Sequence, residues 1–158
     1  MPKFPPTVNE LIEEFEELED WDERYDLIID LGRELPKLAD DHQTESNIVK
    51  GCMSTVWLVT EVNESDNGKQ IQILADSDSI IVKGLIVVLM SFFDQQSPEF
   101  IVQNDAGEFF GKLGLNQHLS PQRRNGLFSM VKQLKMLAAE GRRVRALILC
   151  IFIKYLKN

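Results

Sequence analysis

The segment from Ile80 to Phe93 constrains the fold more than any other part of the sequence. It is apolar on nearly every helical face, and Lys83 is its only charged residue. A β-strand of this length would be unusual, whereas a helix that is apolar all round is normally buried. The preceding residues, Asp76-Ser77-Asp78-Ser79, are of the types that cap helix N-termini. The sequence therefore predicts a buried central helix that other elements must cover.

Two more helices are predicted near the N-terminus. Thr7, with Glu10 three residues later, forms a capping box, so a helix begins at Thr7. Asp20 and Glu23 mark a second start, and the apolar stripe that follows ends before Pro36. These segments predict a helical hairpin with acidic outer faces.

A β-hairpin is predicted between this helical hairpin and the central helix. Residues 56–62 are rich in β-branched and aromatic side chains, which suit a pleated surface. Asn67-Gly68 is a turn dipeptide, and residues 70–75 are typical of the returning strand. Residues 37–54 are polar and irregular, and a third strand around residues 47–51 is left open.

The remainder of the chain is predicted to be helical. Ser97-Pro98 begins one short helix, residues 109–113 belong to another, and Ser120-Pro121 begins the last long helix. The apolar stripe of this last helix ends near Ala138, and Gly141 is expected to stop it. The predicted fold class is α+β: an N-terminal helical hairpin, a small antiparallel β-sheet, and a helical C-terminal half packed on one face.

Composition indicates one globular domain in a reducing compartment. The 158 residues are 44% hydrophobic and 27% charged, which is ordinary for a folded protein. The N-terminal residues have no apolar core of a signal peptide, so we expect a cytoplasmic protein with reduced thiols. Its two cysteines are then not a disulfide framework.

The net charge of −8 is unevenly placed and argues against nucleic acid as a partner. Residues 1–49 carry 15 acids and 4 bases, a charge of −11, while residues 112–158 carry 10 bases and 1 acid, a charge of +9. Two interpretations stay open. The charges solvate opposite faces of one fold, or they form a docking surface for a protein partner.

Cys52 is the candidate reactive residue. Gly51 before it allows a tight turn that leaves the sulfur approachable, where an irregular loop enters a strand. A cysteine reacts as a nucleophile in its thiolate form, and the Ser54 and Thr55 hydroxyls or loop amides are close enough in the sequence to stabilise that charge. Without further information, a lone cysteine is more often a small buried apolar residue.

The spacing of the candidate residues does not favour metal binding or nucleotide binding. Cys52, Cys150, His42 and His118 show no paired spacing of a structural zinc site, so no metal is expected. The glycines form neither a phosphate loop nor a dinucleotide fingerprint, so no nucleotide cofactor is expected.

Three segments resemble the signature motifs of the SufE family of cysteine desulfuration proteins. They match G-C-x-S-x-V-W, S-D-x-x-I-V-K-G and H-L-S/T-x-x-R-x-x-G-L, in that order, at residues 51–57, 77–84 and 118–127. Leu31–Pro36 also fits, and the resemblance spans residues 7–140. It implies that Cys52 carries the persulfide, on an α+β fold shared with the IscU-like scaffold proteins of iron–sulfur assembly.

The resemblance also implies partners and a role. The chain would accept sulfur from a SufS-type cysteine desulfurase, stimulate that enzyme, and deliver sulfur to a downstream Fe–S scaffold complex, with no pyridoxal phosphate or other cofactor of its own. Three alternatives stay open: a paralogous CsdE-like acceptor for a different desulfurase, an IscU-like scaffold, and an interaction module. Neither nucleic acid nor a membrane is expected as a partner, and a homodimer is left open.

Further residues in these segments have two interpretations each. Asp76 and Asp78 are expected to cap the central helix, with Lys83 paired to one of them, or to support the site. His118 is either a local hydrogen-bonding group or a base. Arg123 and Arg124 hold the Cys52 loop, contact the desulfurase, or form exposed salt bridges.

The sequence departs from the family after Glu140. We place the sulfur-acceptor domain at residues 1–140 and treat residues 141–158 as a basic and apolar tail of unknown role. Its eight-residue apolar run, residues 146–153, is too short to span a bilayer. It either continues the last helix, adds an edge strand or lies on a membrane surface, and we expect the run to pack on the body or on a second copy. Cys150 within it is expected to be a buried apolar residue.

Overall fold

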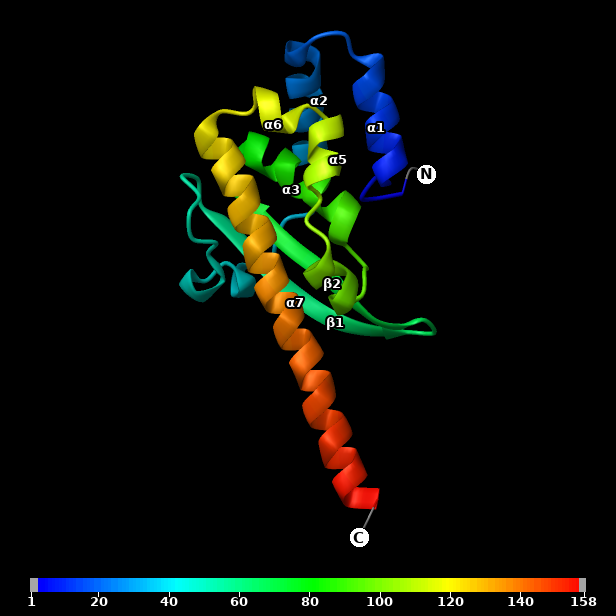
Figure 1. Ribbon diagram of the computed structural model, residues 1–158. Helices are drawn as coiled ribbons and strands as arrows, with labels where there is room; N and C mark the ends of the chain where they lie inside the picture. Colours follow the sequence, from blue (N-terminus) through cyan, green and yellow to red (C-terminus); the bar gives the residue numbers. More distant parts are fainter. Residues whose placement is uncertain (1–2, 157–158) are drawn as a thin grey trace.

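The structure, a computed structural model, describes residues 3–156, and describes side chains throughout this range except at residues 143–151. Seven α-helices and one β-hairpin follow in an α+β order among these residues (Figure 1). Their bounds are α1 Val8–Glu17, α2 Trp21–Glu34, β1 Val56–Ser65, β2 Gly68–Ser77, α3 Ile80–Phe93, α4 Pro98–Gln103, α5 Gly107–Lys112, α6 Leu115–His118 and α7 Pro121–Leu156. The predicted fold class is confirmed.

The N-terminal helices begin where their capping residues predict. Thr7 accepts a hydrogen bond from the Glu10 amide, and the Glu10 carboxylate accepts one from the Thr7 amide, which completes the capping box of α1. Asp20 caps α2 in the same way, by accepting from the Glu23 amide. These local hydrogen bonds satisfy amides that have no partner within the helix, so the sequence alone locates both starts.

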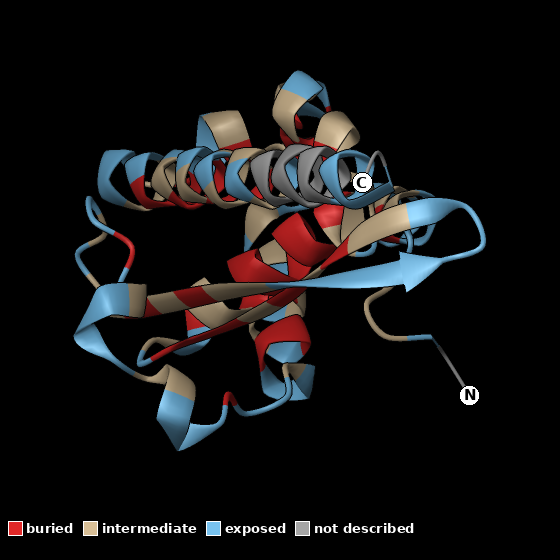
Figure 2. Cartoon of the chain, turned by 90° about the horizontal axis from the view of Figure 1, so that it is seen from below, coloured by how far each residue is buried: buried red, intermediate tan, exposed pale blue. Residues whose placement is uncertain are grey.

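The sheet has two strands and one covered face. β1 and β2 pair antiparallel from Val56–Ser77 to Ser65–Gly68, and the third strand left open at residues 47–51 is only a single bridge from Ile48 to Trp57. Alternate side chains along the strands, including Leu58 and Ile73, are buried on one face of the sheet. This face is covered because α3 contacts β2 and α7 contacts β1 on it. Figure 2 shows burial concentrated beneath these helices and exposed residues at the far end of the hairpin.

The central helix α3 spans Ile80–Phe93, as predicted, and most of its residues are buried. Its closest neighbour is α2, and two glycines allow the approach. A Cβ on Gly84 would overlap the carbonyl oxygen of Ile28, and a Cβ on Gly32 would lie 2.5 Å from the carbonyl oxygen of Ile80. The two backbones therefore touch where a side chain would separate them.

The last helix begins at Pro121 as predicted, but the predicted stop at Gly141 is wrong, because α7 continues to Leu156. Gly141 has a packing role instead. A Cβ there would lie 3.3 Å from Val62 Cγ2 and 3.5 Å from Ile71 Cδ1, so the missing side chain lets α7 approach the hairpin. The residues after it include no proline, so the helix has no local reason to end.

Gly84→Ala tests this close crossing of α2 and α3. The added methyl group must push the helices apart, so we expect the free energy of unfolding to fall by about 3 kcal/mol. Gly111→Ala in α5 is the matched control, because its Cβ would make only ordinary contact, 3.4 Å from Asn116 Nδ2. Chemical denaturation measures both, and equal stability of the two variants would contradict the crossing.

Candidate functional site

Cys52 lies on a loop whose shape depends on the glycine before it. Gly51 has a φ of 93°, a backbone conformation that side chains disfavour. A Cβ on Gly51 would also lie 2.6 Å from the Ser129 Oγ of α7. Met53, the next residue after the cysteine, is 85% exposed. The loop thus packs against α7 at Gly51 and faces solvent at Met53, with Cys52 half-buried between them.

The Cys52 thiol points toward the second turn of α7. Its Sγ donates a hydrogen bond to the Gly126 carbonyl over 3.5 Å, and a Cβ on Gly126 would lie 3.5 Å from the same sulfur. The Ser54 and Thr55 hydroxyls, which the sequence suggested as partners, do not bond to it. Burial raises the pKa of the Cys52 thiol above its ordinary value, because an apolar environment disfavours the thiolate. The resting thiol is shielded, as an uncharged group.

A cavity of about 370 Å³ opens beside Cys52. Its walls come from the Cys52 loop, from the start of α3 and from the first turns of α7, segments that are far apart in the sequence. Its lining combines polar and apolar groups and includes one cationic side chain: Cys52, Met53, Ser54, Ser79, Val82, Leu85, Ser120, Gln122, Arg123, Gly126, Leu127 and Met130. The cavity therefore offers the sulfur a space of mixed polar and apolar lining, with a guanidinium at its wall.

The end of β2 anchors the exit of the Cys52 loop. The Asp78 carboxylate accepts a hydrogen bond from the Thr55 amide at 3.1 Å, and the Ser77 hydroxyl donates to the Thr55 carbonyl at 2.8 Å. Neither contact caps α3, whose N-cap is Ser79 without a side-chain hydrogen bond. The capping role expected for Asp78 is wrong, because its carboxylate bonds to the Thr55 amide of the loop and not to an amide of the helix.

Asp76 and Lys83 form a separate structural pair. The buried Asp76 carboxylate accepts from the amides of Leu38 and Ser77 and lies 3.6 Å from Lys83 Nζ. The predicted pairing of Lys83 is confirmed, but Asp76 does not cap α3. It fixes the chain after α2 to the end of β2, and neither side chain lines the cavity beside Cys52.

Only one of three predicted site residues near the start of α7 lines the cavity: Arg123 does, whereas Arg124 and His118 do not. Arg123 lines it and lies over the Tyr25 ring, 5.6 Å from the ring centroid. Arg124 Nη1 donates to the Asn116 carbonyl at 2.7 Å, and His118 stacks on Trp21 with ring centroids 4.7 Å apart. Arg124 and His118 therefore join α2, α6 and α7 to one another, and neither lines the cavity beside the thiol. Cys150 lies outside the described side chains.

Gly126 is a candidate site residue that the sequence did not single out. Its carbonyl is the acceptor for the thiol, and its missing side chain leaves room for the sulfur. The sequence signal for Gly126 was its place in the third segment that resembles the SufE family. Its hydrogen bond with Cys52, however, joins residues 74 positions apart. No local pattern could pair it with Cys52.

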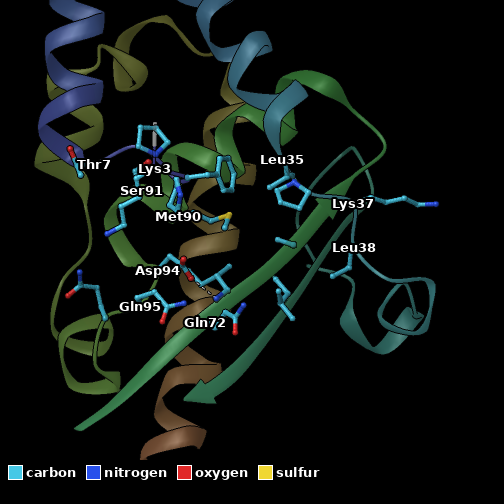
Figure 3. Close-up of a pocket in the computed structure, with 18 of the residues that line it drawn as sticks. Lys3, Thr7, Leu35, Lys37, Leu38, Gln72, Met90, Ser91, Asp94 and Gln95 are labelled. Carbon is cyan, nitrogen blue, oxygen red and sulfur yellow. Dashed lines mark hydrogen bonds between the residues drawn. The ribbon is translucent and has the colours of Figure 1, made fainter. Parts of the chain in front are cut away.

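A larger cavity of about 940 Å³ lies elsewhere, among the N-terminal segment, the chain after α2, β2 and the end of α3 (Figure 3). Asp94 lines it and accepts a hydrogen bond from the Ile73 amide at 2.8 Å. Burial raises the pKa of this carboxyl. None of the residues that line this cavity is a cysteine or a predicted site residue. We therefore assign the site to the smaller cavity beside Cys52.

The raised pKa of Cys52 predicts how its reactivity depends on pH. The rate of alkylation by iodoacetamide should rise around a higher pH midpoint in the folded chain than in urea, and should be slower near neutral pH. Peptide-level mass spectrometry separates Cys52 from Cys150. A midpoint in the folded chain at or below the unfolded value would contradict the shielded thiol.

Gly51→Ala should displace the Cys52 loop without unfolding the protein. The alanine is strained at this φ and its Cβ meets Ser129, so the thiol should leave Gly126 and alkylate several-fold faster. Gly68→Ala is the matched control. Gly68 also has a positive φ, of 105°, but lies in open space at the start of β2. Unchanged alkylation in Gly51→Ala would show that this glycine does not shape the loop.

Comparisons with known proteins agree with the motif segments. The family model described as SufE, an Fe–S metabolism associated domain, matches residues 9–138. An uncharacterized SufE-like protein of Rhizobium etli is 39% identical over 150 residues, covering 92% of this chain and 99% of that protein. Another, of Rhizobium meliloti, is 38% identical over 136 residues, covering 86% and 96%.

A solved structure shows the same fold at low sequence identity. The solution structure of a hypothetical protein from Thermus thermophilus superimposes with a TM-score of 0.67 and 18% identity. The match covers 89% of this chain and 97% of that one. From the family model and the curated relatives, the chain belongs to the SufE family.

Proposed function

We propose that Cys52 accepts sulfur as a persulfide from a SufS-type cysteine desulfurase and carries it to iron–sulfur cluster assembly. Membership of the SufE family gives the coarser role, sulfur transfer in partnership with a cysteine desulfurase. The observation that carries the finer proposal is the half-buried Cys52 thiol, on an anchored loop, beside a cavity open to solvent.

The proposed transfer is a substitution at sulfur. The Cys52 thiolate attacks the outer sulfur of the desulfurase persulfide, so a new sulfur–sulfur bond forms as the enzyme's own sulfur–sulfur bond breaks. The electron pair of the broken bond leaves on the desulfurase cysteine, which takes up a proton, and Cys52 holds the persulfide. No electrons leave the pair of proteins, so no external oxidant is needed, and Cys52 carries sulfur without turning over a substrate alone.

The cavity suits the product of this step. One added sulfur atom extends the Cys52 side chain by about 2 Å, into a space lined by Leu127 and Met130. Arg123 supplies a positive charge at the cavity wall, which favours an anionic sulfur. Once the loop returns to rest, the apolar lining shields the persulfide from thiols in solution.

The loop must move for the thiol to reach the enzyme. The 3.5 Å contact of Cys52 with Gly126 is weak, whereas Thr55 is held by two hydrogen bonds from the end of β2. We infer that the segment from Gly51 to Ser54 swings outward while Thr55 stays fixed. Removing the persulfide from the desulfurase frees that enzyme for another turnover, which would account for stimulation.

The sulfur-acceptor domain is proposed to comprise residues 1–140. The family model ends at residue 138, and Ala138 is the last buried residue of α7 among the described side chains. Among the described residues, those that line the cavity beside Cys52 end at Met130, well before residue 141.

Cysteine turnover by the desulfurase tests the proposal. The wild-type chain should stimulate turnover and gain the mass of one sulfur atom, which reductant removes. Cys52→Ser should abolish both effects, because Cys52 is the thiol that lines the cavity among the described side chains. Cys150→Ser is the matched control and should behave as wild type. Stimulation and sulfur gain that persist in Cys52→Ser, or that vanish in Cys150→Ser, would refute the assignment.

A further inference from the structure

The last part of α7 projects beyond the rest of the protein. Figure 1 shows the helix continuing past the hairpin, with the C-terminus at the opposite end of the molecule from α1 and α2. The family model ends at residue 138, before this projection begins. Residues 142–156, which we call the α7 extension, are therefore an addition to the family domain rather than part of its core.

The described side chains at the end of the α7 extension are apolar and exposed. Phe152, Tyr155 and Leu156 are exposed by 65%, 84% and 76%. Their spacing of three and four residues places them on one face of the helix. In a soluble monomer, a cluster of large apolar side chains in water marks an interaction surface. The packing on the body expected for residues 146–153 is wrong for Phe152 and Ile153, which are 65% and 50% exposed, and the rest of that run lies outside the described side chains.

The charge of the same segment is entirely positive. Residues 142–156 contain four bases and no acid, and Lys157 follows directly, whereas residues 1–141 contain 12 bases and 25 acids. Arg142, four residues before the apolar run, and Lys154, directly after it, are both exposed. The acidic helices α1 and α2 lie far from this end (Figure 1), so they repel an anionic partner of the extension only weakly.

We propose that the α7 extension binds the surface of an anionic lipid bilayer. A lipid surface supplies both negative charge for the bases and an apolar layer for Phe152 and Leu156, while Tyr155 suits the boundary between them. A second copy fits less well, because paired extensions would bring bases against bases in either direction. This proposal takes up the membrane-surface alternative left open for the tail, and differs from the expectation that no membrane is a partner.

The α7 extension lies on the bilayer and does not cross it. The apolar run ends at Lys154 and is about 12 Å long as a helix, against about 30 Å for a bilayer core. Among the residues that the structure describes, no helix is both long and apolar enough to span a membrane. Binding is therefore reversible and depends on charge.

Co-sedimentation of the full chain with vesicles tests this proposal. Wild type should bind vesicles of phosphatidylglycerol and phosphatidylcholine, less so at raised salt, and should bind pure phosphatidylcholine weakly. Phe152→Asp should weaken binding about tenfold or more, and Lys154→Gln about fivefold. Both side chains are exposed, so the fold should be unaffected. Lys132→Gln, the same charge change at an exposed position earlier in α7, is the matched control and should bind as wild type.

Three results would overturn the proposal. Wild type fails to bind the anionic vesicles, the two extension variants bind as well as wild type, or Lys132→Gln loses as much binding as Lys154→Gln. If vesicle binding is absent, light scattering identifies the alternative occupant. A wild-type dimer that Phe152→Asp converts to a monomer would assign the extension to a second copy. None of these readouts depends on sulfur transfer.

Discussion

The arrangement of the other helices and strands depends on the burial of α3 on all sides. Because the helix has almost no polar face, α2 must cover one side at the touching glycines Gly32 and Gly84, while β2 and α7 cover others. This packing brings the start of α3 beside the start of α7. Ser79, Val82 and Leu85 of that region become one wall of the Cys52 cavity, so the site follows from the same constraint as the core.

Around Cys52 the structure combines firm anchors with one weak contact. The loop is held at Thr55 and shaped at Gly51, but the thiol itself is joined to α7 only through a long hydrogen bond to Gly126. Burial keeps the thiol neutral and shielded at rest. In the proposed function, these properties protect a carried sulfur and still let a partner draw Cys52 outward, so that reactivity is set by loop position rather than by an activated thiolate.

Features with a local cause could be predicted from the sequence. The capping box at Thr7, the apolar run of α3 and the hairpin depend on neighbouring residues, and all three are confirmed. Predictions that depended on distant contacts were less successful. Asp78 bonds to Thr55 rather than to α3, and Gly141 makes room for the hairpin instead of ending α7. Cys52 was found through its glycine and the family motif, whereas its acceptor Gly126 became visible only in three dimensions.

Single-turnover transfer tests the central claim most directly. A cysteine desulfurase loaded with one radiolabelled persulfide sulfur is mixed with this chain without reductant, and the label is followed by mass spectrometry and non-reducing electrophoresis. We predict that the label leaves the desulfurase and appears on the peptide that contains Cys52, with no transfer to Cys52→Ser. Label that stays on the desulfurase with the wild-type chain, or that moves equally to Cys52→Ser, would contradict the assignment of Cys52 as the sulfur acceptor.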